Sequence, residues 1–306
     1  MILLGTYCTT ALAHTNTGVI EKKHSQQPTM NPYIDELDQF MTTAGGVLPV
    51  GAVTTGPGTH TNLSVAQSFI PQKAVLTRIQ FLMAKNITTT YPCSLAIKDN
   101  ITGVDLTSIR LDPEQFPVAD NAHPENLTWI DFNFTDIWVI PGQTYYMVIS
   151  TANITNNFYY VTGNGSNLYP NGTAYWSLDN GNTWAPIPPG DADGCFKTYG
   201  LRETTLAITP GGGLYTSFII TNTGNVTAWD INASLGVQGG LIFLGSRVTS
   251  FYIPELDPGN SVTVKTILIF GLGKIQMTLT VKAANVREQA KTINAFLLFF
   301  FVVGIH

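Results

Sequence analysis

Residues 129–134 read Trp-Ile-Asp-Phe-Asn-Phe, and from Ile130 onward an apolar side chain alternates with a polar one. A period of two places the apolar side chains on one face of a β-strand and the polar ones on the other. Residues 75–81 alternate in the same way, and residues 145–149 form an apolar run typical of a buried strand. Clusters rich in Asn, Asp, Gly and Pro separate these runs, so residues 62–201 are predicted to form a β-sandwich.

A second group of strands is predicted from residue 202 to the end of the chain. Residues 218–220, 262–264 and 277–281 have strand patterns, and residues 222–225 and 257–260 have turn sequences. About seven short strands in about 100 residues are typical of an immunoglobulin-like sandwich. The predicted fold class is therefore all-β, with two sandwich domains.

The first 61 residues have little periodicity. Residues 1–13 resemble a truncated signal segment, because a short apolar start is followed by Ala11-Leu12-Ala13. No basic region precedes the apolar start, so the alternative is that these residues are no signal at all. Residues 14–61 are rich in Gly, Pro and Thr and are predicted to form an extended arm. Within that arm Pro49 permits an edge strand but not a central one.

The chain ends in eleven consecutive apolar residues, Ala295 to Ile305. As a helix this run would span about 16 Å, half of the ~30 Å of hydrocarbon in a bilayer, whereas as a strand it reaches about 35 Å. We therefore expect a final β-strand buried on both faces. We also expect it to contribute an assembly strand through Phe296, Leu298, Phe300 and Val302.

Charge is scarce in this chain. Its 306 residues include 15 Lys+Arg and 20 Asp+Glu, so 11% are charged, against about 25% in a typical soluble domain. The net charge of −5 argues against nucleic acid as a partner. The 33 aromatic residues argue against a disordered polyelectrolyte, and no apolar run reaches the roughly 18 residues of a transmembrane span.

Asn-x-Ser/Thr sequons are unusually frequent. With 22 Asn and 53 Ser+Thr in 306 residues, chance would give about four, and the chain has ten: Asn62, Asn86, Asn100, Asn126, Asn133, Asn153, Asn164, Asn171, Asn225 and Asn232. Exposed sequons in an exported protein accept N-linked glycans. We expect an extracellular glycoprotein, and the alternative is that Asn- and Thr-rich turns create sequons by accident.

Two regions resemble known families. Residues 62–201 resemble jelly-roll-like domains of archaeal and bacterial surface proteins, through segments 66–69, 76–79, 141–146 and 195–200. Residues 203–303 resemble the CARDB-type (cell-adhesion-related) immunoglobulin-like modules, through segments 221–228 and 253–261. The resemblance implies a spacer or assembly module on a surface protein.

Residues 177–184, Ser-Leu-Asp-Asn-Gly-Asn-Thr-Trp, match the aspartate-box pattern of sialidase-like propellers. In that pattern the Asp caps a hairpin turn and the Trp packs beneath it. A propeller requires repeats, and this chain has one copy, so we interpret the motif as a structural turn.

Aromatic residues are dense between positions 158 and 184, with seven in 27 residues. Exposed rings stack on sugars, so Tyr160, Tyr169, Tyr175 and Trp176 are candidates for carbohydrate binding. The alternative is that they fill the sandwich core.

Three further predictions concern cysteines, calcium and catalysis. Cys93 and Cys195 either form a disulfide or are two buried free thiols. Asp191 and Asp193 are weak candidate Ca²⁺ ligands, although turn capping is the simpler interpretation. No catalytic motif is present, so we expect no enzyme. The sequence as a whole predicts a structural or adhesive surface protein that self-associates into a filament or surface layer by strand exchange through its terminal segments, or else a carbohydrate-binding module.

Overall fold

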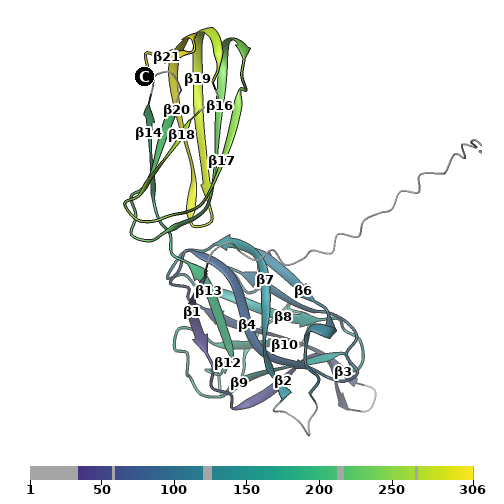
Figure 1. The fold of residues 1–306 in the computed structure, drawn as a ribbon. Helices are drawn as coiled ribbons and strands as arrows, with labels where there is room; N and C mark the ends of the chain where they lie inside the picture. The colour runs from purple at the N-terminus through teal and green to yellow at the C-terminus, as the bar shows by residue number, and fades with distance from the viewer. Residues whose placement is uncertain (1–33, 57–58, 120–125, 212–216, 266–267, 306) are drawn as a thin grey trace, which may run out of the picture. The chain divides into compact units, whose positions relative to one another are not determined.

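The computed structural model describes residues 34–56, 59–119, 126–211, 217–265 and 268–305. Within these ranges the chain forms antiparallel β-sheets, and its one short helical element is the 3-10 turn Pro113–Gln115 (Figure 1). The all-β prediction is therefore confirmed. In the described part of the chain, no helix is long and apolar enough to cross a membrane. The predicted signal segment 1–13 lies outside the described residues.

The first body contains thirteen strands in one large, folded sheet. They are β1 Glu36–Met41, β2 Gly46–Gly56, β3 Thr59–Phe69, β4 Val75–Lys85, β5 Cys93–Lys98, β6 Thr107–Leu111, β7 Thr128–Trp138, β8 Tyr145–Thr151, β9 Phe158–Asn164, β10 Ala174–Ser177, β11 Ala185–Pro186, β12 Asp193–Gly194 and β13 Phe196–Leu201. The main strand order is β1-β13-β4-β9-β2-β3-β8-β5-β6.

The core of this body lies between the inward faces of these strands. The alternation that predicted β7 is observed, because Ile130 and Phe132 are buried and Asp131 and Asn133 are exposed. Phe132 packs edge-on against Phe81, with 6.4 Å between the ring centroids. This packing of alternating strands gives a sandwich-like architecture, as the sequence predicts.

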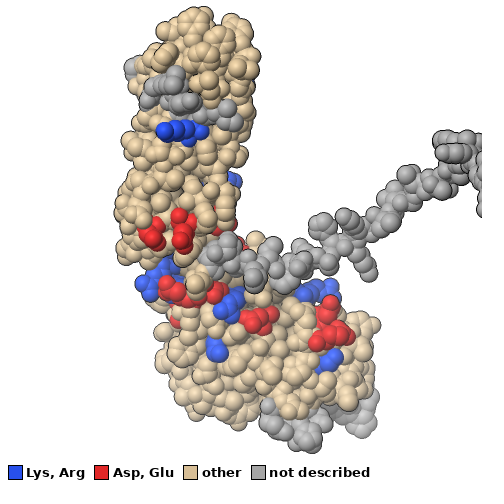
Figure 2. All heavy atoms as spheres, viewed as in Figure 1, with Lys and Arg blue, Asp and Glu red and all other residues tan. Residues whose placement is uncertain are grey.

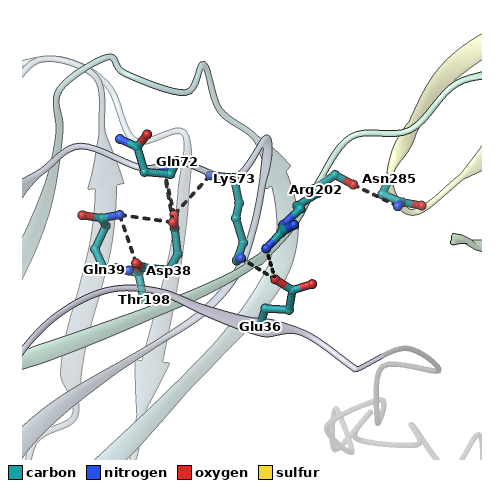
Figure 3. A network of polar contacts seen from close by, with 8 residues as sticks. All are labelled: Glu36, Asp38, Gln39, Gln72, Lys73, Thr198, Arg202 and Asn285. Atoms are coloured by element: carbon teal, nitrogen blue, oxygen red, sulfur yellow. Dashed lines mark hydrogen bonds and ion pairs between the residues drawn. The ribbon is translucent and has the colours of Figure 1, made fainter. Parts of the chain in front are cut away.

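Strand β1 belongs to this body, which corrects the predicted arm. Figure 3 shows its polar contacts: Lys73 Nζ donates to Glu36 Oε2 at 2.7 Å, and the backbone N–H of Gln72 donates to Asp38 Oδ2 at 3.0 Å. The backbone N–H of Gln39 donates to Thr198 Oγ1 at 3.0 Å. Because β1 also pairs with β13, an arm that is free from residue 14 to residue 61 is wrong for residues 36–41, 46–56 and 59–61, which lie in strands. Residues 14–33 and 57–58 lie outside the described residues.

Strand β2 shows how a proline is accommodated inside a sheet. Residues 46–51 pair with β9, whereas pairing with β3 begins only at Gly51. Pro49 therefore lies in a part of β2 that is bonded on one side, and its missing N–H faces away from a ladder. Around Pro49, β2 pairs on one side, as an edge strand does. The prediction fails for the strand as a whole, because β2 lies between β9 and β3 in the sheet.

The second body contains two sheets. The three-stranded sheet has the order β14-β15-β18 and the five-stranded sheet has the order β17-β16-β19-β20-β21. Their bounds are β14 Leu206–Gly211, β15 Ser217–Asn222, β16 Ala228–Leu244, β17 Val248–Leu256, β18 Ser261–Lys265, β19 Phe270–Ala283, β20 Val286–Phe299 and β21 Phe301–Val303. One apolar core is shared by both sheets, and Phe218, Leu235 and Leu279 are fully buried in it.

The apolar end of the chain folds differently from the prediction. It forms a hairpin between β20 and β21, in which Leu298 is opposite Phe301. Ala295, Leu297 and Val302 point inward and are buried, whereas Phe296 and Leu298 are exposed. A single strand buried on both faces is therefore wrong, because only the inner face of this sheet has a partner layer.

Candidate functional site: the apolar end of the second body

The outer face of the five-stranded sheet carries a row of large apolar side chains. The register places Leu241 opposite Leu272, Leu272 opposite Leu298, and Leu298 opposite Phe301. These four residues are 64%, 44%, 42% and 50% exposed, respectively. Neighbouring strands are about 4.8 Å apart, so the row extends about 14 Å across four strands. Such a row is unusual, because outward positions of a half-solvated antiparallel sheet are normally polar.

Aromatic rings extend this row to the end of the sheet. The ring of Phe270 lies 5.8 Å from Phe243, 6.0 Å from Phe299 and 4.8 Å from Phe300, measured between centroids. Phe296 lies opposite Val303 on the other side of the row, and both are more than a third exposed. We define the apolar end by nine exposed residues: Leu241, Phe243, Leu244, Leu272, Phe296, Leu298, Phe299, Phe301 and Val303.

Glycines shape the strand that carries Leu241. Gly239 and Gly240 have φ values of +76° and +57°, and the register between β16 and β19 shifts between Gly239 and Leu241. A side chain at Gly239 would meet the carbonyl oxygen of Lys274 at 2.8 Å. Arg247 Nη1 donates to the carbonyl oxygen of Gly239 at 2.9 Å. A bulge of this kind redirects the side chains that follow it, and here Leu241 and Phe243 point outward.

The apolar end has few charges near it. The sequence has no charged residue from Ala233 to Ser246 or from Thr292 to Ile305. On β19, Lys274 lies opposite Phe296 in the strand register. On the face drawn in Figure 2, the end of this body that carries β21 shows little red or blue. Further along β19 and β20 the outer face becomes neutral and polar, and Thr278 and Thr292 share a hydrogen bond at 2.9 Å.

The sequence predicted part of the apolar end. Of the four predicted assembly residues, Phe296 and Leu298 are exposed, Phe300 is half-buried and Val302 is buried. Leu241, Phe243 and Leu272 were missed, because their strands are distant in sequence and only the sheet register places them beside Leu298. The signal available in the sequence was the pair of charge-free segments, 233–246 and 292–305.

The structure separates the ten sequons by accessibility. Asn62 is buried and its Nδ2 donates to Asn180 Oδ1, so the nitrogen that would carry a glycan is engaged inside the fold. In the folded chain Asn62 is therefore inaccessible, and its glycosylation is not tested. The other nine are at least partly accessible: Asn86, Asn100, Asn126, Asn133, Asn153, Asn164, Asn171, Asn225 and Asn232. Their glycosylation stays a prediction.

The candidate sugar-binding aromatics do not form a platform in solvent. Tyr160 and Tyr169 are buried, at 8% and 6% exposure, and the Tyr169 hydroxyl donates to Gln39 Oε1 at 2.9 Å. Trp176 is half-buried and packs against the core, whereas half-buried Tyr175 meets the ring of Tyr146. Tyr169 therefore belongs to the main core, whereas Tyr160 lies in a smaller cluster with Ala84 and Ala119.

The aspartate-box segment forms the predicted turn. Asp179 accepts hydrogen bonds from the Thr183 backbone N–H at 2.9 Å and from Thr183 Oγ1 at 2.7 Å. Trp184 Nε1 donates to the Gly181 carbonyl oxygen at 3.0 Å. Asn180 and Gly181 have φ values of +61° and +84°. The hydrogen bonds from Thr183 lower the pKa of Asp179 to about 2.

The remaining predicted residues have structural partners. Cys93 and Cys195 are both buried free thiols, so a disulfide between them is not formed, and burial raises the pKa of Cys195 to about 11. Asp193 is buried and its Oδ2 accepts the backbone N–H groups of Leu168 and Tyr169 at 2.9 and 2.8 Å. Asp191 is exposed. Among the described residues there is no group of three or more His, Cys, Asp or Glu placed to hold a metal ion.

A comparison with protein-family models finds no match to this chain. A search of curated proteins likewise returns no significant match. The resemblances to jelly-roll-like and CARDB-type domains thus rest on the segments quoted above, and the evidence on function is the surface just described.

Proposed function

We propose that this protein is a non-enzymatic, extracellular structural or adhesive glycoprotein, and that its apolar end packs against a second copy of the chain. A contiguous patch of exposed apolar side chains marks an interaction surface. The observation that carries the proposal is the row from Leu241 to Phe301, which is apolar across four strands and exposed along its whole length. A jelly-roll-like domain followed by a CARDB-type module would suit this role.

A second copy is the occupant that these residues favour. The outer face of a sheet packs well against another sheet face, and an uncharged apolar row is complementary to itself. A lipid surface is less favoured, because membrane-binding faces are rich in Lys, Arg and Trp. The aromatic residues of the apolar end are all Phe, and the cations described beside it are Lys274 and Arg247.

The sequons support the same assignment. None occurs after Asn232 in the sequence. Asn232 and Leu241 are nine residues apart on β16, which corresponds to about 30 Å along a strand. Glycans on Asn225 and Asn232, the sequons of the second body, would therefore leave the apolar end uncovered, as a protein–protein contact requires.

The mode of assembly differs from strand donation by the C-terminal segment. Residues 286–299 and 301–303 are already paired in their own sheet, so donating them would break that pairing. Packing of the sheet faces buries the same side chains without this loss. An isologous pair formed in this way closes as a dimer, and a filament or lattice would need a further contact.

Charge substitutions test this proposal. We expect Leu272→Asp combined with Leu298→Asp to lower the association constant at least about tenfold in sedimentation velocity, because an unpaired charge in an apolar contact costs more than about 1.4 kcal/mol. The matched control is Thr278→Asp with Thr292→Asp, which adds the same charges to the same strands and face beyond the apolar end.

Two results would overturn the proposal. One is a wild-type chain that remains monomeric at high micromolar concentration. The other is equal association of the two charged variants. If the wild type instead binds phosphatidylcholine vesicles and only the apolar-end variant loses this binding, a lipid surface replaces the second copy as the occupant.

A further inference from the structure

A cavity of about 250 Å³ lies in the first body. It is open to the surface on one side, and its inner wall includes Val65 and Ala66 on β3, Met147 and Ile149 on β8, and Val161 on β9. Protein cores are packed to crystal-like density, with few voids larger than a water molecule. A space of this volume among core residues is therefore a feature of the fold that requires a separate explanation.

Apolar side chains dominate the wall of the cavity, and its polar side chains are already bonded. Gln67 Oε1 accepts the backbone N–H of Gly194 at 2.7 Å, and Thr162 Oγ1 donates to the carbonyl oxygen of Gly46 at 2.7 Å. Asp193 Oδ2 accepts the backbone N–H groups of Leu168 and Tyr169. A ligand with many hydroxyl groups would lose its hydrogen bonds to water here and gain few in return. The wall therefore selects for apolar ligands over sugars.

The cavity reaches the surface between three short segments. Gly45 precedes β2 and Gly46 is its first residue. Gly163 and Gly165 flank Asn164, the last residue of β9. Ile187 and Pro188 follow β11. Gly165 and Pro188 are exposed. A Cβ atom at Gly46 would have no heavy atom within 4 Å, so this side of the opening is unobstructed. A small molecule thus has a path into the core without unfolding of a strand.

We propose that this cavity binds a neutral, apolar small molecule, such as an alkylbenzene or a branched hydrocarbon of similar size. An engineered apolar cavity of about 150 Å³ is known to bind benzene, so the larger volume here suits about seven to ten non-hydrogen atoms. This site is independent of the apolar end, because it lies in the other body and uses none of the same residues.

Toluene is the probe for this proposal. We expect saturable binding of one toluene per chain in isothermal titration calorimetry, and a rise in thermal midpoint of about 2–4 °C near saturation. Methyl β-glucoside, a polar ligand, should give neither effect. The same titration repeated with Leu272→Asp/Leu298→Asp should be unchanged, because the cavity is not part of the apolar end.

Two cavity variants and one control make the test specific. Ala174→Leu fills the interior and Gly46→Leu narrows the opening, since both residues line the cavity, and each should lower toluene affinity at least about tenfold. Ala185→Leu is the control, because Ala185 is exposed and is not among the lining residues. If Ala174→Leu fails to fold, Gly46→Leu still decides the question. No binding by the wild type, or equal binding by Gly46→Leu and Ala185→Leu, would show that the proposal is wrong.

Discussion

At the scale of single residues, the aspartate-box turn is closed by the carboxylate of Asp179 and covers Asn62 through Asn180. The segment Asp179-Asn180-Gly181 supplies a capping carboxylate and two positions with positive φ, so the turn follows from its own residues. Asn62 has an equally clear sequon, yet it is buried against that turn. The turn can be predicted because its hydrogen bonds join residues within one eight-residue segment. The burial of Asn62 cannot, because its partner Asn180 is 118 positions away in the sequence.

Asp179 makes the turn sensitive to acid. Its pKa in the folded protein is lowered to about 2, whereas an unperturbed Asp titrates near 4. A lowered pKa means that the carboxylate stabilises the fold above the unfolded pKa, and that this contribution is lost as the pH falls through the folded pKa.

We therefore expect Asp179→Ala to lower the thermal midpoint at neutral pH. The difference from wild type should shrink steadily between about pH 4 and pH 2, as measured by circular dichroism. Asp191→Ala, a change to an exposed Asp outside the turn, serves as the control. A difference that stays constant over this range would contradict the role assigned to the carboxylate.

At the scale of elements, the period-two pattern predicted strands with one buried apolar face and one polar face, and it failed at residues 295–305, whose exposed face is also apolar. β7 alternates as expected, because one of its faces meets the core. The run from Ala295 to Ile305 lacks any polar alternation, so the sequence offers no sign of a turn, yet the chain reverses at Phe299 and Phe300 between β20 and β21. Strand pairing with β19 fixes the end of β20 and hence the position of the reversal.

Phe299 is an unusual residue for this reversal. Its φ is +56°, a conformation that costs a non-glycine residue about 1–2 kcal/mol. Glycine would adopt it without strain. The ring of Phe299 stacks near Phe270 at 6.0 Å, and such a pair contributes about 0.5–1.5 kcal/mol.

We expect Phe299→Gly to change the free energy of unfolding by less than about 1 kcal/mol, because relief of strain offsets the lost stacking. It should nevertheless weaken self-association, since it removes an exposed ring from the apolar end. Chemical denaturation and sedimentation velocity on the same sample measure the two quantities. A variant that is clearly destabilised and still associates normally would show that Phe299 serves folding rather than assembly.

At the scale of the whole molecule, the structure shows where charged residues are absent. The sequence shows that charge is low overall. The fold brings two charge-free segments, 233–246 and 292–305, into one sheet, where β19 lies between the strands that carry them. Like-charge repulsion between two such surfaces is small, and apolar burial is left as the main contribution to any contact between them.

This gives a prediction about salt. Association through the apolar end should be nearly constant from about 0.05 M to about 0.5 M sodium chloride, because screening acts on charges. Ammonium sulfate should strengthen it, since excluded salts favour apolar burial. Analytical ultracentrifugation across both salts measures this. Dissociation that steepens with sodium chloride would indicate an ionic contact instead.

The sequence by itself determined the all-β class, the outward face of Asn133 and the aspartate-box turn, because these depend on neighbours within a few residues. Only the tertiary structure decided that residues 36–56 join the first sheet and that Cys93 and Cys195 are buried free thiols. It also decided that Tyr160 and Tyr169 are buried and that Leu241 lies in one row with Leu272 and Leu298. These facts depend on which distant strands pair and in which register, and the alternation of a single strand carries no information about its partner.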